Sequence, residues 1–338
     1  LDLPKPLGRV HGLMPPEPIQ AQDERPDNLV QIMAPLASRF RGQLWEQIAL
    51  PRACGDDWLL SLCNMGPVMR RKQIVMMHDA QVFRQPESYS RLFQYWYGFA
   101  QPRLGHRAAL VLTVSEHSKR ELEHFGVVPK GVTKVVHDGA DHILRVTPDP
   151  ETLSRHNLQP QGYFLAIGSL APHKNLDMLV AAARARKDRS KPLVIAGGGN
   201  ASVFGDAGIT PSEDVRLLGR VSDAELRALY QNATALTFPS ITEGFGLPPA
   251  EAMFCDCPVI ASTGGAIPEV CGTGEAAIML DPHDVSGWTD AMDSLSADPA
   301  RCQELAKAGR LRVAPFTWKR AAETLVGHLM DLSPQPPS

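Results

Sequence analysis

Short apolar runs alternate with amphipathic segments along the second half of the chain. The runs at residues 163–167, 193–196, 215–218, 235–238 and 259–261 have the length of buried strands. Between them, residues 176–186, 223–232 and 249–254 carry apolar positions at helical spacing. This alternation predicts parallel βαβ units with right-handed crossovers, and strands that are apolar throughout predict helices on both faces of the sheet.

The first half shows the same alternation less regularly. Residues 73–77, 109–114 and 132–136 predict strands, residues 89–106 predict a helix, and Ser115 has the position of an N-cap. Residues 1–50 are proline-rich and predict irregular structure, and Pro148 and Pro150 predict a linker. We therefore predict two doubly wound α/β domains, residues 1–150 and 151–316, with a final helix and tail over residues 317–338.

Composition narrows the class of protein. The 338 residues include 43% hydrophobic and 21% charged residues, which suits two globular cores. A net charge of −3 with interspersed signs argues against nucleic acid as a partner. The sequence shows neither a signal-peptide pattern nor an apolar run of about 18 residues, so we expect a cytoplasmic protein with only peripheral contact to the inner face of a membrane. The six cysteines show no disulfide or zinc spacing and are expected to be reduced.

Two acids, Glu243 and Glu251, flank the sequence Gly244-Phe245-Gly246-Leu247 between a predicted strand and a predicted helix. Glycines permit close approach of a ligand to the backbone, and the N–H groups at a helix N-terminus favour an anion. Carboxylates accept hydrogen bonds from hydroxyls and repel phosphate. The stretch therefore predicts a ligand that is both anionic and rich in hydroxyls, such as a nucleotide-activated sugar; the alternative is two acids stabilised by the helix dipole alone.

A second loop, Gly168-Ser169-Leu170-Ala171-Pro172-His173-Lys174-Asn175, follows the first strand of the same half. Lys174 can neutralise a diphosphate without a metal. The alternative is a solvated loop in which Asn175 caps the next helix.

Three further polar clusters carry less weight. His78 and Asp79 follow the predicted strand at residues 73–77. His78 has two interpretations: it faces a ligand at the end of the strand, or its side chain is satisfied by hydrogen bonds to local backbone. The stretch His137 to His142 has the composition of a metal site, but a loop turn explains it better, and we predict no metal. The sequence Gly197-Gly198-Gly199-Asn200 lacks the spacing of a dinucleotide fingerprint and predicts a turn, which makes a dehydrogenase the less favoured interpretation.

The two loops, together with Gly264-Gly265 and Pro268-Glu269-Val270, resemble the retaining family 4 glycosyltransferases of the GT-B fold. The resemblance also covers His78-Asp79 and the turn at Gly139, and spans about residues 40–330. It implies two Rossmann-like domains facing across a cleft, with Glu251 on the donor ribose and Lys174 on the diphosphate. It further implies that the amides of Phe245 to Leu247 contact the donor sugar. The catalytic residues it implies are His78, Asp79, Lys174 and Glu243, and the donor-binding residues are Gly168, Ser169, His173, Lys174, Glu243, Gly244, Phe245, Gly246, Leu247 and Glu251.

The same resemblance implies a metal-independent hexosyltransferase that retains anomeric configuration and needs no cofactor besides its nucleotide-sugar donor. GDP-mannose is the expected donor, and the expected acceptor is a lipid-linked glycan or oligosaccharide in bacterial exopolysaccharide biosynthesis. Two other functions stay open on this fold: a sugar phosphorylase or epimerase, and a non-catalytic nucleotide-sugar-binding subunit.

Three departures from the family pattern stand out. His173 occupies a position where relatives usually have arginine, which predicts a weaker, pH-sensitive diphosphate clamp. Asp138-Gly139 replaces the usual Asn-Gly and suits the same turn. The glycine-rich loop with which relatives open is not found in residues 1–45, so we expect either a truncated chain or an unusual N-terminal domain.

Overall fold

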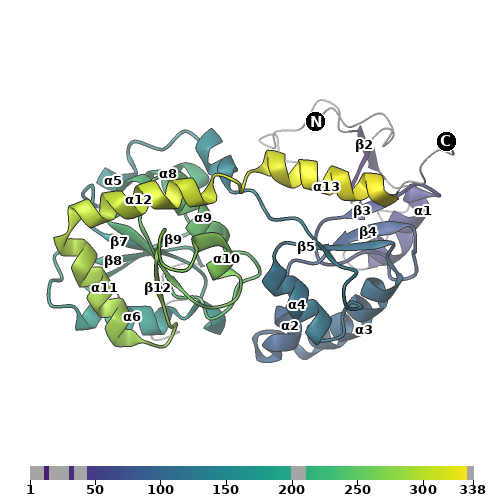
Figure 1. Ribbon diagram of the computed structural model, residues 1–338, viewed down its shortest axis with the longest axis horizontal. Helices are drawn as coiled ribbons and strands as arrows, with labels where there is room; N and C mark the ends of the chain where they lie inside the picture. Colours follow the sequence, from purple (N-terminus) through teal and green to yellow (C-terminus); the bar gives the residue numbers. More distant parts are fainter. Residues whose placement is uncertain (1–10, 15–29, 34–43, 199–210, 333–338) are drawn as a thin grey trace. The chain divides into compact units, whose positions relative to one another are not determined.

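The computed structural model describes residues 11–14, 30–33, 44–198 and 211–332, and the chain divides into two compact units (Figure 1). The first unit takes the chain up to Val136 and again from Ala322. The second unit takes residues 137–321. The domain boundary that the sequence predicts near residue 150 therefore lies inside the second unit.

A six-stranded parallel sheet forms the centre of the second unit, in the order β12-β11-β10-β7-β8-β9. The chain starts at β7 in the middle, moves outward through β8 and β9, and returns to β10 on the other side of β7. The loops after β7 and β10 therefore flank the point where the strand order reverses, where ligands bind in such sheets. The strands are β7 (Phe164–Ile167), β8 (Leu193–Ala196), β9 (Val215–Gly219), β10 (Ala235–Phe238), β11 (Val259–Ser262) and β12 (Ile278–Leu280).

Helices cover both faces of this sheet, with α6 and α11 on one side and α8, α9 and α12 on the other (Figure 1). Leu179 of α6 and Trp288 of α11 are fully buried against strand residues such as Phe164 and Ile195. Each strand and helix predicted for this half is present with its ends within two residues, while β12 and α10 to α12 were not predicted. The helices are η4 (Asp141–Arg145), α5 (Thr152–Arg155), η5 (Pro172–Lys174), α6 (Leu176–Ala185), α8 (Asp223–Asn232), α9 (Leu247–Phe254), α10 (Ile267–Cys271), α11 (Val285–Ala297) and α12 (Pro299–Val313).

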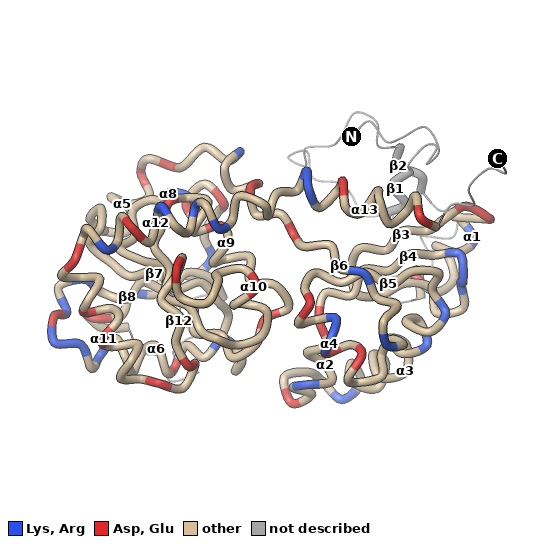
Figure 2. The backbone as a smooth tube through the Cα atoms, in the orientation of Figure 1, with Lys and Arg blue, Asp and Glu red and all other residues tan. Residues whose placement is uncertain are grey.

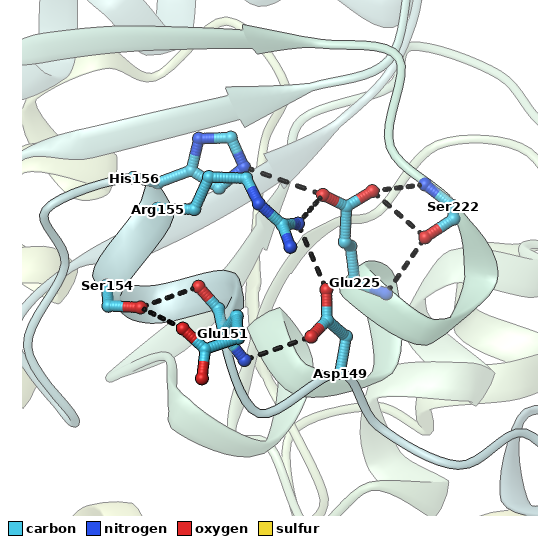
Figure 3. A network of polar contacts seen from close by, with 7 residues as sticks. All are labelled: Asp149, Glu151, Ser154, Arg155, His156, Ser222 and Glu225. Atoms are coloured by element: carbon cyan, nitrogen blue, oxygen red, sulfur yellow. Dashed lines mark hydrogen bonds and ion pairs between the residues drawn. The ribbon is translucent and has the colours of Figure 1, made fainter.

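The segment around Pro148 and Pro150 is attached to α8 and is not a free linker (Figure 3). The backbone N–H of Asp149 donates to the carbonyl of Ala224 at 3.1 Å. Arg155 Nη1 donates to Asp149 Oδ2 at 3.0 Å and to Glu225 Oε1 at 2.6 Å, and Glu225 also forms the capping box at the start of α8. These contacts explain why the compact unit begins before the two prolines.

The first unit contains a four-stranded parallel sheet in the order β3-β4-β5-β6 and a separate parallel pair, β1-β2. Val75 and Val111 of the larger sheet pack against Leu104 of α3 and Leu122 of α4. Ser115 is the predicted N-cap of α4 and accepts a hydrogen bond from the N–H of Ser118 at 2.9 Å. The strands are β1 (His11–Met14), β2 (Val30–Met33), β3 (Leu59–Ser61), β4 (Gln73–Met76), β5 (Leu110–Thr113) and β6 (Lys134–Val135).

Helices of this unit begin earlier in the chain than the sequence predicted. The prediction of irregular structure over residues 1–50 is wrong for β1, for β2 and from Trp45 onward, where a π-helix leads into α1. The search for a glycine-rich loop over residues 1–45 falls mostly outside the described residues. The helices are η2 (Trp45–Ala49), α1 (Leu50–Cys54), α2 (Gln81–Arg84), η3 (Pro86–Ser88), α3 (Arg91–Arg107), α4 (Glu116–His124) and α13 (Trp318–Leu332), the last grouped with this unit from Ala322.

Acidic and basic residues are interspersed along the backbone of the second unit (Figure 2). All six cysteines are free thiols, and burial raises the pKa of Cys255 to about 12. Across the described ranges, no helix is both long and apolar enough to cross a bilayer.

Candidate active site

The two loops predicted from the sequence meet at the switch point of the second unit. The N–H of Ile241 donates to the carbonyl of His173 at 2.7 Å. Asn175 adopts a left-handed conformation, with φ of 55°, and its side-chain amide donates to Pro239 O at 3.2 Å and Pro282 O at 2.6 Å. The alternative in which Asn175 caps the next helix is wrong for its side chain, which joins the loops and forms no cap hydrogen bond.

Lys174 and Glu243 form an ion pair between these loops. Lys174 Nζ lies 2.7 Å from Glu243 Oε1, and the two side chains are only 20% and 13% exposed. The ammonium also lies 5.6 Å from the ring centroid of Phe238. The ammonium suits an incoming phosphate, whereas the carboxylate suits a hydroxyl donor, so the pair presents both preferences at one place.

The backbone of Glu243 is held by the glycines that follow β11. A Cβ on Gly265, whose φ is 59°, would lie 2.4 Å from the backbone N of Glu243, and a Cβ on Gly264 would lie 2.2 Å from Ile241 O. The N–H of Ala266 donates to the carbonyl of Glu243 at 3.0 Å. The Gly264-Gly265 motif therefore shapes the loop that carries Glu243, a role that the sequence alone did not reveal.

The N-terminus of α9 offers few backbone N–H donors. Gly246 is the N-cap, with φ of 111°, and Pro248 and Pro249 lack N–H groups, so Leu247 is the only residue among the first three of α9 with an N–H. The side chain of Phe245 is buried, with its ring 5.6 Å from that of Phe316. Contacts of a ligand with residues 244–246 would therefore use the backbone.

Gly168 and Ser169 lie in the loop after β7. The N–H of Gly168 donates to Ala196 O at 3.1 Å, and Ser169 Oγ accepts from the N–H of Ala171 at 3.4 Å. Gly197 has φ of 109°, and a Cβ there would lie 2.7 Å from Gly168 O. The predicted glycine turn thus allows β8 to approach this loop; Gly199 and Asn200 lie outside the described residues.

Glu251 is 9% exposed and is held by two side chains. Its Oε2 accepts a hydrogen bond from the hydroxyl of Tyr230 at 3.0 Å, and its Oε1 lies 3.1 Å from His142 Nε2. The hydrogen bond to Glu251 raises the pKa of His142 above its ordinary value. A carboxylate has about four lone-pair positions, so these two partners leave capacity for about two more donors.

Sequence reasoning missed both side chains that hold Glu251, His142 and Tyr230. The stretch from His137 to His142 was interpreted as a turn that resembles a metal cluster by composition. His142 instead contacts Glu251, and His137 Nε2 lies 4.0 Å from Glu269 Oε2. The described part of the chain holds no group of three or more His, Cys, Asp or Glu side chains arranged around a metal position. No spacing in the sequence pairs His142 with Glu251, because tertiary packing alone brings them together.

His78 and Asp79 belong to the first unit and follow β4. The N–H of His78 donates to Asn64 Oδ1 at 2.6 Å, and its Nε2 lies 2.7 Å from Leu62 O. Because a carbonyl only accepts, Nε2 carries a proton, which leaves Nδ1 as an acceptor in the neutral ring. Asp79 Oδ1 accepts from the N–H of Gln81 at 3.0 Å, in the first turn of α2. Local backbone thus satisfies part of each side chain, and their catalytic roles stay predictions.

Comparison with known proteins gives the family. The family model described as glycosyl transferases group 1 matches residues 131–312. An MMP alpha-(1->4)-mannosyltransferase from Mycolicibacterium hassiacum is 30% identical over 294 residues, covering 81% of this chain and 67% of the relative. An O-antigen chain mannosyltransferase B from Escherichia coli is 31% identical over 266 residues, covering 75% of this chain and 68% of the relative.

A solved structure matches the arrangement of strands and helices. Sucrose-phosphate synthase from Thermosynechococcus elongatus superposes with a TM-score of 0.71 at 21% identity, over 92% of this chain and 85% of that chain. At this identity the similarity concerns the fold. The chain therefore belongs to the group 1 glycosyl transferases, enzymes of sugar transfer, and has the GT-B fold.

Proposed function

We propose that the chain transfers a mannosyl group from GDP-mannose to a hydroxyl of a lipid-linked glycan or oligosaccharide in polysaccharide assembly, with retention of anomeric configuration. The two relatives that are about 30% identical are named as mannosyltransferases, one of them as an O-antigen chain mannosyltransferase. The choice of guanine as the base of the donor nucleotide is based on the resemblance to the family. The observation that carries the proposal is the placement of Lys174, Glu243 and Glu251 around the loops at one switch point.

Each of these side chains suits one part of a nucleotide sugar. The half-buried ammonium of Lys174 and the N–H of Leu247 suit the diphosphate. The two remaining acceptor positions of Glu251 match the adjacent hydroxyls of a ribose. Glu243 suits a hydroxyl of the donor sugar.

Transfer breaks the bond between the anomeric carbon and the diphosphate oxygen, whose electron pair leaves with the diphosphate. Lys174 stabilises the negative charge that develops there. The acceptor hydroxyl attacks from the same face, and its proton passes to the departing phosphate oxygen. Glu243 is ion-paired at 2.7 Å, which stabilises its charge and makes it a weak nucleophile, so front-face attack suits this site better than a covalent intermediate on Glu243.

The ribose assignment predicts the effect of Glu251→Gln. The amide retains the shape of the side chain but replaces one acceptor oxygen with a donor, so we expect the affinity for GDP to fall by about tenfold or more. A thermal-shift titration with GDP, UDP, GDP-mannose and UDP-glucose measures it, because ligand binding to the native state raises the melting temperature. Glu304→Gln, an exposed acid of the same unit, is the control. Parent-like GDP affinity in Glu251→Gln would contradict the assignment.

The departure at His173 predicts that His173→Arg binds GDP more tightly than the parent toward pH 8. A free imidazole is largely neutral at pH 8, whereas arginine stays charged. The carbonyl of His173 holds Ile241, and this main-chain contact survives the substitution. Isothermal titration at several pH values measures the difference. Equal affinities of the two proteins over this range would exclude a diphosphate contact by His173.

The products of the reaction distinguish the proposed transfer from the other functions that the fold allows. Release of GDP only when an acceptor is present supports transfer. Turnover of a sugar phosphate with a saccharide would support a phosphorylase. Conversion of the donor sugar into its epimer in the absence of an acceptor would support an epimerase. Donor binding without any turnover would support a binding subunit.

A further inference from the structure

A line of hydrogen bonds joins Glu251 to the first residue of α13. His142 Nε2 lies 3.1 Å from Glu251 Oε1, and the indole Nε1 of Trp318 lies 3.1 Å from His142 Nδ1. The backbone N–H of Trp318 donates to Asp141 Oδ1 at 2.7 Å. All of these residues belong to the second unit.

The chemistry of the indole fixes the tautomer of His142. An indole nitrogen donates and cannot accept, so His142 Nδ1 must accept from Trp318 and hold no proton. The single proton of the neutral ring is then on Nε2, which faces the carboxylate of Glu251. The carboxylate only accepts and the indole only donates, so both partners require the proton on Nε2.

Main-chain contacts hold this arrangement in place. The N–H of Ala140 donates to Phe316 O at 3.0 Å. Gly139 lies so close to the next turn of chain that a Cβ there would be 2.1 Å from the backbone N of Trp318. Residues 139–142 and 316–318 thus pack as one structure, which explains why glycine suits the turn after Asp138. This packing fixes the main chain on both sides of the contact, while the side chains of His142 and Trp318 themselves are 40% and 41% exposed.

We propose that His142 is a positioning residue for Glu251, with its neutral tautomer set by Glu251 and Trp318 together. The proposal rests on the proposed function, in which Glu251 accepts hydrogen bonds from the adjacent hydroxyls of a nucleotide ribose. His142 occupies one acceptor position of Oε1 and Tyr230 one of Oε2, so the remaining positions are directed to the ligand. Without His142, Tyr230 would be left as the one side chain of this pair that orients the carboxylate.

Neighbouring charges and the indole act on His142 in opposite directions. The carboxylates of Glu251, Asp223 and Asp141 raise its pKa, which favours a second proton. That proton would enter at Nδ1 and remove the acceptor of Trp318 Nε1. The indole therefore favours the neutral ring that the three acids disfavour.

Nitrogen-15 NMR of the full chain tests the tautomer without any ligand. We expect His142 to show a protonated Nε2 and an unprotonated, hydrogen-bonded Nδ1 near pH 8. In Trp318→Phe we expect the neutral ring to keep its proton on Nε2, because Glu251 still accepts it, but to take up a second proton at Nδ1 at a higher pH than in the parent. A protonated Nδ1 in the neutral parent ring, or uptake of the second proton at the same pH in Trp318→Phe as in the parent, would overturn the proposal. This measurement stands whether or not the proposed function is correct.

Binding of GDP tests the positioning role. We expect His142→Leu to weaken binding by about tenfold, and His142→Gln, which retains a donor, to return to within about threefold of the parent. The exposed His124 of the first unit supplies the control, His124→Leu. Parent-like affinity in His142→Leu, or no recovery in a folded His142→Gln, would overturn the positioning role. Failure of the parent to bind any nucleotide would instead contradict the proposed function.

Discussion

Lys174→Ala is expected to lower the rate of transfer by about two to three orders of magnitude, the loss typical when one preorganised charge-stabilising group is removed. The ammonium lies 2.7 Å from Glu243 Oε1 and is mostly shielded from solvent. Its removal takes away the cation that stabilises the leaving diphosphate. It also leaves Glu243 without its counter-charge, so the carboxylate repels the phosphate that the lysine attracted.

The double variant separates these two effects. If repulsion by Glu243 contributes, Lys174→Ala combined with Glu243→Gln will bind GDP more tightly than Lys174→Ala alone, while its rate of transfer stays low. Steady-state kinetics for the rate and calorimetry for GDP affinity give the two readouts. Lys187→Ala, an exposed lysine of the same unit, serves as the control. A parent-like rate and affinity in Lys174→Ala would remove Lys174 from the site.

The second half of the chain could be predicted closely because its local signals agree. Strands such as residues 193–196 are uniformly apolar, and helix 223–232 begins after a serine cap with a capping glutamate. This strand and this helix are both present at the predicted residues. The first fifty residues gave no such agreement, and β1, β2 and the π-helix at Trp45 were missed. Proline content there outweighed short apolar runs that carry little periodicity.

In the candidate site, too, some features could be predicted from local sequence and others depend on tertiary packing. The loops with Lys174 and Glu243 could be found because each combines a strand end, a glycine or proline turn and a charge. The role of Asn175 as a bridge between loops could not, since its partners Pro239 and Pro282 are far away in sequence. The partners of Glu251 follow from the packing of η4 and α8 against α9, which no single segment of sequence encodes.

Gly265→Ala is expected to destabilise the second unit by about 2–4 kcal/mol and to remove most of the activity. Its φ of 59° costs an alanine about 1–2 kcal/mol, and the added Cβ would lie 2.4 Å from the N and 2.7 Å from the O of Glu243. These are backbone atoms that cannot rotate away. The loop of Glu243 must therefore move, and the hydrogen bond from Ala266 to Glu243 O is lost.

Gly126→Ala separates the strain of the backbone from this contact. Gly126, in the first unit, has a φ of 67°, close to that of Gly265, but a Cβ there meets nothing within 4 Å. Denaturant unfolding and the rate of transfer, measured on both variants, should show Gly265→Ala as the less stable and the less active of the two. Equal losses would mean that backbone strain alone accounts for both effects, and that Gly265 does not shape the loop of Glu243. A larger loss of stability in Gly265→Ala, together with a loss of activity in protein that is still folded, would mean that the position of Glu243 depends on Gly265, a glycine 22 residues later in the chain. The reason would be that a glycine, which has no side chain, leaves room for the backbone of Glu243.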